Sequence, residues 1–145
     1  MESKKERLKS CLVQHSKNGN ITVDRHKDKL IYQFDLTIDD SENKWGELQP
    51  KVSAVSVRDN MVESYNIRIG EVSSEDAVTD IEDCVVRSRP PCLDKFDTGH
   101  SESVIQPHIR MSDEYCSIDE FIDFMNRLMT RLSQSAYPLV VLPQL

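Results

Sequence analysis

The chain has 145 residues, of which 38% are hydrophobic and 30% are charged, and its formal net charge is −7. This length fits a single domain over residues 1–145, which can bury a core without disulfides or metal. No apolar run approaches the roughly 20 residues that a membrane helix needs, and no signal-peptide core follows the lysines near the start. We therefore expect a cytoplasmic protein that has no membrane partner.

The negative charge opposes binding to nucleic acid by bulk attraction, because phosphate contacts depend on lysine and arginine. Eight of the 18 basic residues nevertheless fall between Lys4 and Lys29, so a local basic face that binds nucleic acid stays open. The spacings of the cysteines fit neither a zinc site nor a disulfide framework, and we expect reduced, mostly buried thiols: Cys11, Cys84, Cys92 and Cys116. No metal or cofactor is expected.

The first half of the chain predicts a helix followed by an antiparallel meander of strands. Ser3 and Glu6 have capping-box spacing at the start of a helix over 2–15, and Asn18-Gly19-Asn20 predicts a turn, since Asn and Gly tolerate positive φ. A charged turn over 24–28, a polar loop over 39–50 and a turn over 58–60 separate the predicted strands. These strands alternate apolar with polar residues: 21–23, 30–38, 52–57 and 65–69.

The second half predicts two helices and an interrupted strand. Helical spacing of apolar residues behind an acidic first turn predicts a helix over 73–86, although its β-branched end leaves a strand ending open. Residues 93–99 are predicted to be irregular, and 104–111 to be an edge strand that Pro107 interrupts. Ser117 and Glu120 then form a second capping box before an unbroken apolar stripe, which predicts a helix that covers the sheet.

The tail over 137–145 is apolar and punctuated by prolines. It either adds an edge strand or docks on a partner, and docking would make four apolar side chains the partner-binding residues: Tyr137, Leu139, Val141 and Leu142. The elements together predict an α+β fold, in which an antiparallel sheet of four to six strands carries the C-terminal amphipathic helix and a second helix on one face.

Phosphate-cradling loops are excluded, because the four glycines lie far apart in the sequence. The candidate catalytic and phosphate-binding residues are Asp97, His100, His108 and Arg110. Two imidazoles and a carboxylate suit acid–base work, and Arg110 shares a strand face with His108, where both can point at one phosphate. A metal site built from the two histidines and Asp97, or a plain turn with two surface histidines, are alternatives that spacing leaves open.

These residues fall in two short segments that precede the capped helix: Lys95-Phe96-Asp97-Thr98-Gly99-His100 and Gln106-Pro107-His108-Ile109-Arg110. The segments and the helix resemble the C-terminal half of TumE-like toxins of prokaryotic toxin–antitoxin systems. The resemblance implies a toxin that acts on RNA, with His100 and His108 as the acid–base pair, Arg110 as the phosphate holder and Asp97 beside them.

Two functions follow as hypotheses. The first is a non-catalytic interaction module of a prokaryotic toxin–antitoxin or defence-type system, which binds another protein or a second copy of this chain. The acidic charge, the missing catalytic motif and the apolar tail favour it. The alternative is the TumE-like enzyme that cleaves RNA by histidine chemistry, so the sequence leaves open whether the protein is an enzyme.

Overall fold

A computed structural model describes residues 3–37, 52–70, 72, 75–92, 95–101, 104–111 and 115–134. Within these ranges, only the backbone is described for residues 95–101, 104, 105 and 111. The predicted polar loop over 39–50 and the predicted tail over 137–145, with its four partner-binding residues, lie outside the described residues.

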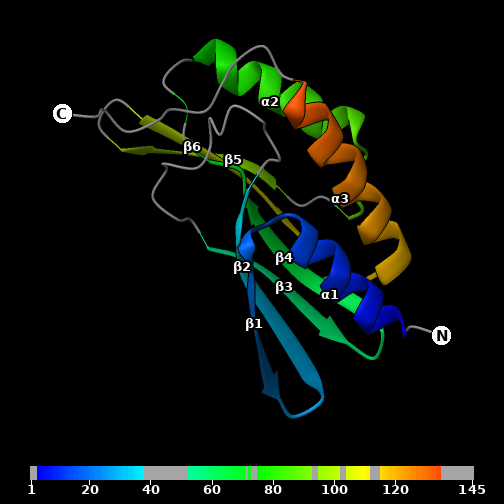
Figure 1. Ribbon diagram of the computed structural model, residues 1–145. Coiled ribbons are helices and arrows are strands. Elements are labelled where there is room, and N and C mark those ends of the chain that lie inside the picture. The colour runs from blue at the N-terminus through cyan, green and yellow to red at the C-terminus, as the bar shows by residue number, and fades with distance from the viewer. Residues whose placement is uncertain are drawn as a thin grey trace.

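The described chain forms helix α1 (Lys4–Gln14), strands β1 (Ser16–His26), β2 (Lys29–Leu36), β3 (Val52–Arg58) and β4 (Met61–Arg68), and helix α2 (Glu75–Arg87). Strands β5 (Lys95–Ser101), β6 (Val104–Met111) and β7 (Cys116–Ser117) follow, and helix α3 (Ile118–Ser133) comes last. The antiparallel sheet has the order β1-β2-β3-β4-β6-β5, and the two-residue β7 pairs with β4 beside this path. All three helices lie on one face of the sheet (Figure 1), so the α+β prediction is confirmed.

Both predicted capping boxes are present. The Ser3 hydroxyl accepts the N–H of Glu6 at 3.1 Å, and the Ser117 hydroxyl accepts the N–H of Glu120 at 3.0 Å. A serine at this position satisfies one of the N–H groups that the start of a helix leaves open. Behind its cap, α3 buries the predicted apolar stripe and one further ring, that of Phe124.

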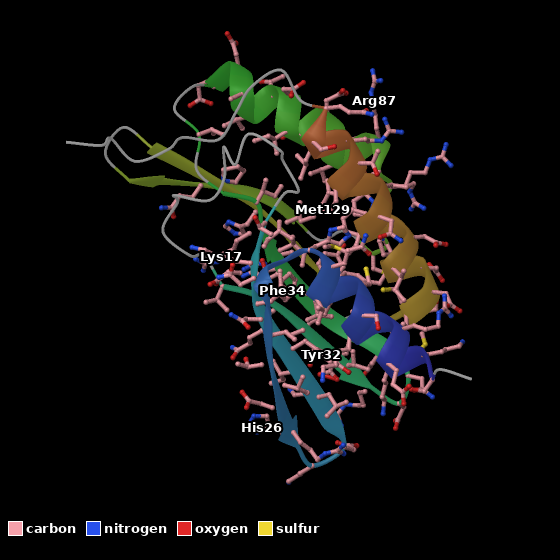
Figure 2. The ribbon with its side chains drawn as sticks, in the orientation of Figure 1. Lys17, His26, Tyr32, Phe34, Arg87 and Met129 are labelled. Atoms are coloured by element: carbon pink, nitrogen blue, oxygen red, sulfur yellow. The ribbon has the colours of Figure 1, made fainter. Side chains whose placement is uncertain are left out.

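The core lies between the helices and one face of the sheet, here called the inner face. Tyr32 and Phe34 of β2 belong to the same buried cluster as Leu8 of α1 (Figure 2). On β4 the ring centroid of Tyr65 lies 5.1 Å from that of Phe121, a separation at which tilted aromatic pairs attract one another. The β1–β2 hairpin extends beyond this core, with His26 near its tip (Figure 2).

The turn predicted at Asn18-Gly19-Asn20 is wrong, because these residues lie inside β1. Asn18 and Gly19 do have positive φ values of 58° and 69°, but the pairing of β1 with β2 shifts there, between Ser16 and Ile21. Positive φ serves a β-bulge as well as a turn, and a bulge lets the strand continue. The charged turn predicted over 24–28 is correspondingly shorter, since β1 runs to His26.

The prediction of an irregular stretch over 93–99 is wrong for residues 95–99, which belong to β5. The prediction that β6 is an edge strand is also wrong, because β6 lies between β4 and β5. Pro107 is tolerated inside the sheet because its position lies just beyond the last β4–β6 pair, Arg68 with His108, so its missing N–H breaks no ladder. Its carbonyl accepts the N–H of Ile69 at 3.0 Å.

Candidate functional site

The side of the sheet that faces away from the helices is here called the outer face. Strand side chains alternate between the two faces, so the neighbours of the buried residues Tyr32, Val55, Tyr65 and Ile109 occupy it. The register aligns them across strands, with Ser56 opposite both Ile31 and Ser64, and Arg110 opposite Asn66. On β2, β3, β4 and β6 the outer face carries Lys29, Ile31, Gln33, Asp35, Val52, Ala54, Ser56, Arg58, Ser64, Asn66, Arg68, His108 and Arg110.

The outer face is hollowed over β2, β3 and β4, where a cavity of about 280 Å³ opens to solvent. We call it the central hollow. It is lined by alternate residues of β2 and β3, by three consecutive residues of β4 and by one residue of β6: Lys29, Ile31, Ala54, Ser56, Ser64, Tyr65, Asn66 and Arg110. Four strands therefore supply one concave surface, and the register of the sheet holds its side chains in place.

Two polar atoms in the lining of the central hollow are buried without a hydrogen-bond partner among the described residues. They are the hydroxyl oxygen of Ser56 and the amide oxygen of Asn66. Ser56 is only 8% exposed. A buried polar atom that makes no hydrogen bond costs about 1–3 kcal/mol, so most such atoms in native proteins have a partner. A ligand that supplies a hydrogen bond here, once rotation of the side chain turns the atom toward the hollow, would remove that cost.

Among the described side chains of β2, β3, β4 and β6, acidic residues neutralise two of the four cations on the outer face. Lys29 Nζ lies 3.6 Å from Glu63, and the Arg58 guanidinium lies 2.9 Å from Glu63 and 2.7 Å from Asp28. The hydrogen bond and the negative charge of Glu63, with the charge of Asp28, raise the pKa of Arg58. Glu63 reaches these partners because β4 has a bulge there: Ser56 pairs with Ser64 and Val57 with Val62.

The other two cations, Arg68 and Arg110, are exposed and form no ion pair with a described residue. Arg110 pairs with Asn66 across β4 and β6, and Arg68 pairs with His108. On β4 and β6 the outer face therefore carries two arginines whose charge no described carboxylate offsets.

A second hollow, of about 480 Å³, lies on the same face over β1, β2 and the start of β3. It is lined by Asn20, Thr22, Gln33, Asp35 and Val52 together with Ile21 and Phe34. Ile31 of the central hollow and Gln33 of this one are two positions apart on β2, so the hollows adjoin along the strand. From Lys29 to Asp35 the two hollows span about 20 Å of extended backbone.

The structure places the sequence-predicted residues on two neighbouring strands. Asp97 of β5 is in register with His108 of β6, and Nδ1 of His108 lies 3.4 Å from the carbonyl oxygen of Gln106. His100 is in register with Ile105, three positions beyond Asp97, and an odd separation places two strand positions on opposite faces. This register favours Asp97 over His100 as the neighbour of His108, while the acid–base pair itself stays a prediction.

Sequence reasoning missed the residues of the central hollow. Ser64, Asn66 and Arg68 alternate with Tyr65 and Ile67 in the sequence, a pattern that predicts a solvated strand face. The pattern carries no sign of a hollow, because the hollow depends on which strands are neighbours. The partner-binding role of the tail also stays a prediction.

Within the described ranges, no three His, Cys, Asp or Glu side chains come together in a group that could hold a metal ion. None of the described helices is long and apolar enough to cross a membrane. Comparison of the chain with family models, curated proteins and solved structures gives no match.

Proposed function

We propose that this protein is a non-catalytic binding module that holds an extended segment of a partner protein on the outer face of its sheet. The observation that carries the proposal is the buried, unpartnered pair of Ser56 Oγ and Asn66 Oδ1 in the central hollow. Both atoms accept hydrogen bonds, and a serine hydroxyl also donates one. A peptide backbone offers both kinds of group at every residue.

The shape of the outer face suits an extended chain better than a compact small molecule. Both hollows are open, and they adjoin along β2 over about 20 Å, which corresponds to about six residues of extended peptide. Their linings mix apolar side chains such as Ile31 and Ala54 with polar ones such as Gln33 and Ser64. Small molecules usually bind in enclosed pockets, whereas both hollows are open to solvent.

The experiment selects random peptides of about ten residues, which exceed the length of the two hollows when extended, on the immobilised protein. Enriched peptides are then measured against Ala54→Tyr, which fills the central hollow with a residue that strands accept. The matched control is Val23→Tyr, at a 40% exposed position of β1 outside both hollows.

We expect the enriched peptides to bind Val23→Tyr as they bind the unmodified protein, and to bind Ala54→Tyr at least about tenfold more weakly, a loss of 1.4 kcal/mol or more. Failure to enrich any peptide, or equal binding to both variants, contradicts the proposal. Membership of a toxin–antitoxin or defence-type system stays a prediction that this experiment does not address.

A second function, cleavage of RNA by histidine chemistry, has one specific observation in its favour. Asp97, His108 and Arg68 occupy one row of register positions across β5, β6 and β4. A carboxylate beside an imidazole fixes its tautomer, and a guanidinium holds phosphate. This function predicts cleavage of a labelled RNA that His108→Ala abolishes while the thermal midpoint is retained. Undiminished cleavage by that variant contradicts it.

A further inference from the structure

We propose that the partner segment carries an acidic side chain, and that Arg110 and Arg68 bind its carboxylate at the β6 end of the central hollow. This inference rests on the proposed function and names the chemistry of the segment that the outer face selects. The bound group is thus an aspartate or glutamate of an extended protein segment.

The register brings the two arginines within reach of one carboxylate. Arg68 pairs with His108, and Arg110 lies two positions further along β6, so the arginines are diagonal neighbours on adjacent strands. Such positions lie about 7–8 Å apart, which long side chains span. Guanidinium groups bind carboxylates through two parallel hydrogen bonds, an arrangement that gives both energy and directional selectivity.

The distribution of charge on the outer face indicates where an acidic residue fits. Glu63 already binds Lys29 and Arg58 at the other side of the central hollow, and Asp35 lines the second hollow, where it repels an anion. Only Arg68 and Arg110 offer charge that no described carboxylate balances. The acidic residue of the segment therefore lies beside β4 and β6, across the sheet from Asp35 of β2.

Asn66 adds a contact next to the bound carboxylate. It is in register with Arg110, and its unpartnered Oδ1 can only accept a hydrogen bond. A backbone N–H of the segment, adjacent to the acidic residue, supplies that donor. The carboxylate and the neighbouring N–H thus satisfy two groups of this protein that lie side by side.

The experiment uses the enriched peptides in a double-mutant cycle. Each acidic residue in a peptide is replaced by its amide, and affinity is measured against the unmodified protein and against Arg110→Gln. The matched control is Arg25→Gln, which removes the same charge from an exposed position of β1 that is outside both hollows. The cycle isolates the pairwise contribution, since each single change removes the same contact.

We expect Arg110→Gln to weaken binding about tenfold to a hundredfold, as loss of a charge-assisted hydrogen bond does, and Arg25→Gln to change it little. Replacement of the acidic residue by its amide should weaken binding to the unmodified protein by the same factor. The same replacement should weaken binding to Arg110→Gln almost no further.

Three other outcomes overturn the inference. Enriched peptides that lack acidic residues, but whose binding Ala54→Tyr still abolishes, leave the binding module intact and refute the acidic segment alone. If amide replacement weakens binding equally to the unmodified protein and to Arg110→Gln, the acidic segment alone is again refuted. Binding of a labelled RNA that depends on Arg110, with no enriched peptide, refutes both proposals together and assigns the arginines to phosphate.

Discussion

Two serines of β3 should respond in opposite directions to the same substitution. Ser56→Ala removes a hydroxyl that is buried and makes no hydrogen bond with a described residue. Ser53→Ala removes a hydroxyl that is also buried but accepts the backbone N–H of Arg68 at 2.9 Å. We expect the first change to stabilise the protein and the second to destabilise it.

The magnitudes follow from the cost of an unsatisfied polar group. Burying such a group without a hydrogen bond costs about 1–3 kcal/mol. Ser56→Ala removes this cost, but the lower strand preference of alanine offsets part of the stabilisation. Ser56→Ala should therefore raise the free energy of unfolding by about 1 kcal/mol. Ser53→Ala leaves the Arg68 N–H without its acceptor and should lower that free energy by about 1–3 kcal/mol.

Urea unfolding followed by circular dichroism measures both variants, with thermal unfolding as a second readout. For a chain of this length, 1 kcal/mol corresponds to about 2–4 °C in Tm. If Ser56→Ala destabilises the protein as much as Ser53→Ala does, the Ser56 hydroxyl has a partner, and the reasoning that makes the central hollow a binding site is refuted.

Three further predictions concern the helix cap and the cysteines. Ser117→Ala should lower the free energy of unfolding by about 1 kcal/mol, because it removes the N-cap of α3. The control, Ser133→Ala at the other end of α3, should change the free energy measured by urea unfolding only slightly. Equal effects of the two substitutions would contradict the capping role. Iodoacetamide at a pH of about 8 should label half-buried Cys92 before Cys116, because burial raises the pKa of Cys116 from 9.0 to about 12 and the thiolate is the reactive form. Mass spectrometry of digests gives the order of labelling, and earlier labelling of Cys116 would contradict the prediction. Stability should fall as pH rises from about 9 toward 12, because a thiol whose pKa is higher in the folded state stabilises the fold fully only below its unfolded pKa. Urea unfolding at several pH values should show a shallower fall for Cys116→Ala, and an unchanged slope would count against this cause.

The sequence predicts the local features of this fold well, because they depend on residues close together in the chain. The capping boxes at Ser3 and Ser117, and the apolar stripe of α3, need only neighbours within a few turns of helix. The β1–β2 and β3–β4 hairpins follow from alternation and short turns, and Asp59 and Asn60 take the positive φ that a two-residue hairpin turn requires.

The features that escaped prediction depend on partners that are distant in the sequence. Residues 95–99 become a strand because β6 pairs with them, and Gly99 and Thr98 give little sign of it. Pro107 lies inside the sheet because of where β4 ends. The central hollow requires β2, β3, β4 and β6 to be adjacent, and an alternating pattern in one strand cannot indicate that Ser56 Oγ and Asn66 Oδ1 will both be covered.

The contact between α1 and α3 joins the two ends of the described chain. Arg7 of α1 binds Asp119 of α3 at 2.8 Å across 112 positions, and the buried face of α1, which includes Leu8, packs on α3 and β1. During synthesis on the ribosome, α1 emerges before α3, and more than a hundred residues are added between the two helices. At about 5–20 residues per second this takes about 6–20 seconds. Over that interval the apolar side of α1 is only partly covered, so the nascent chain is most prone to aggregate or to recruit a chaperone before α3 is made.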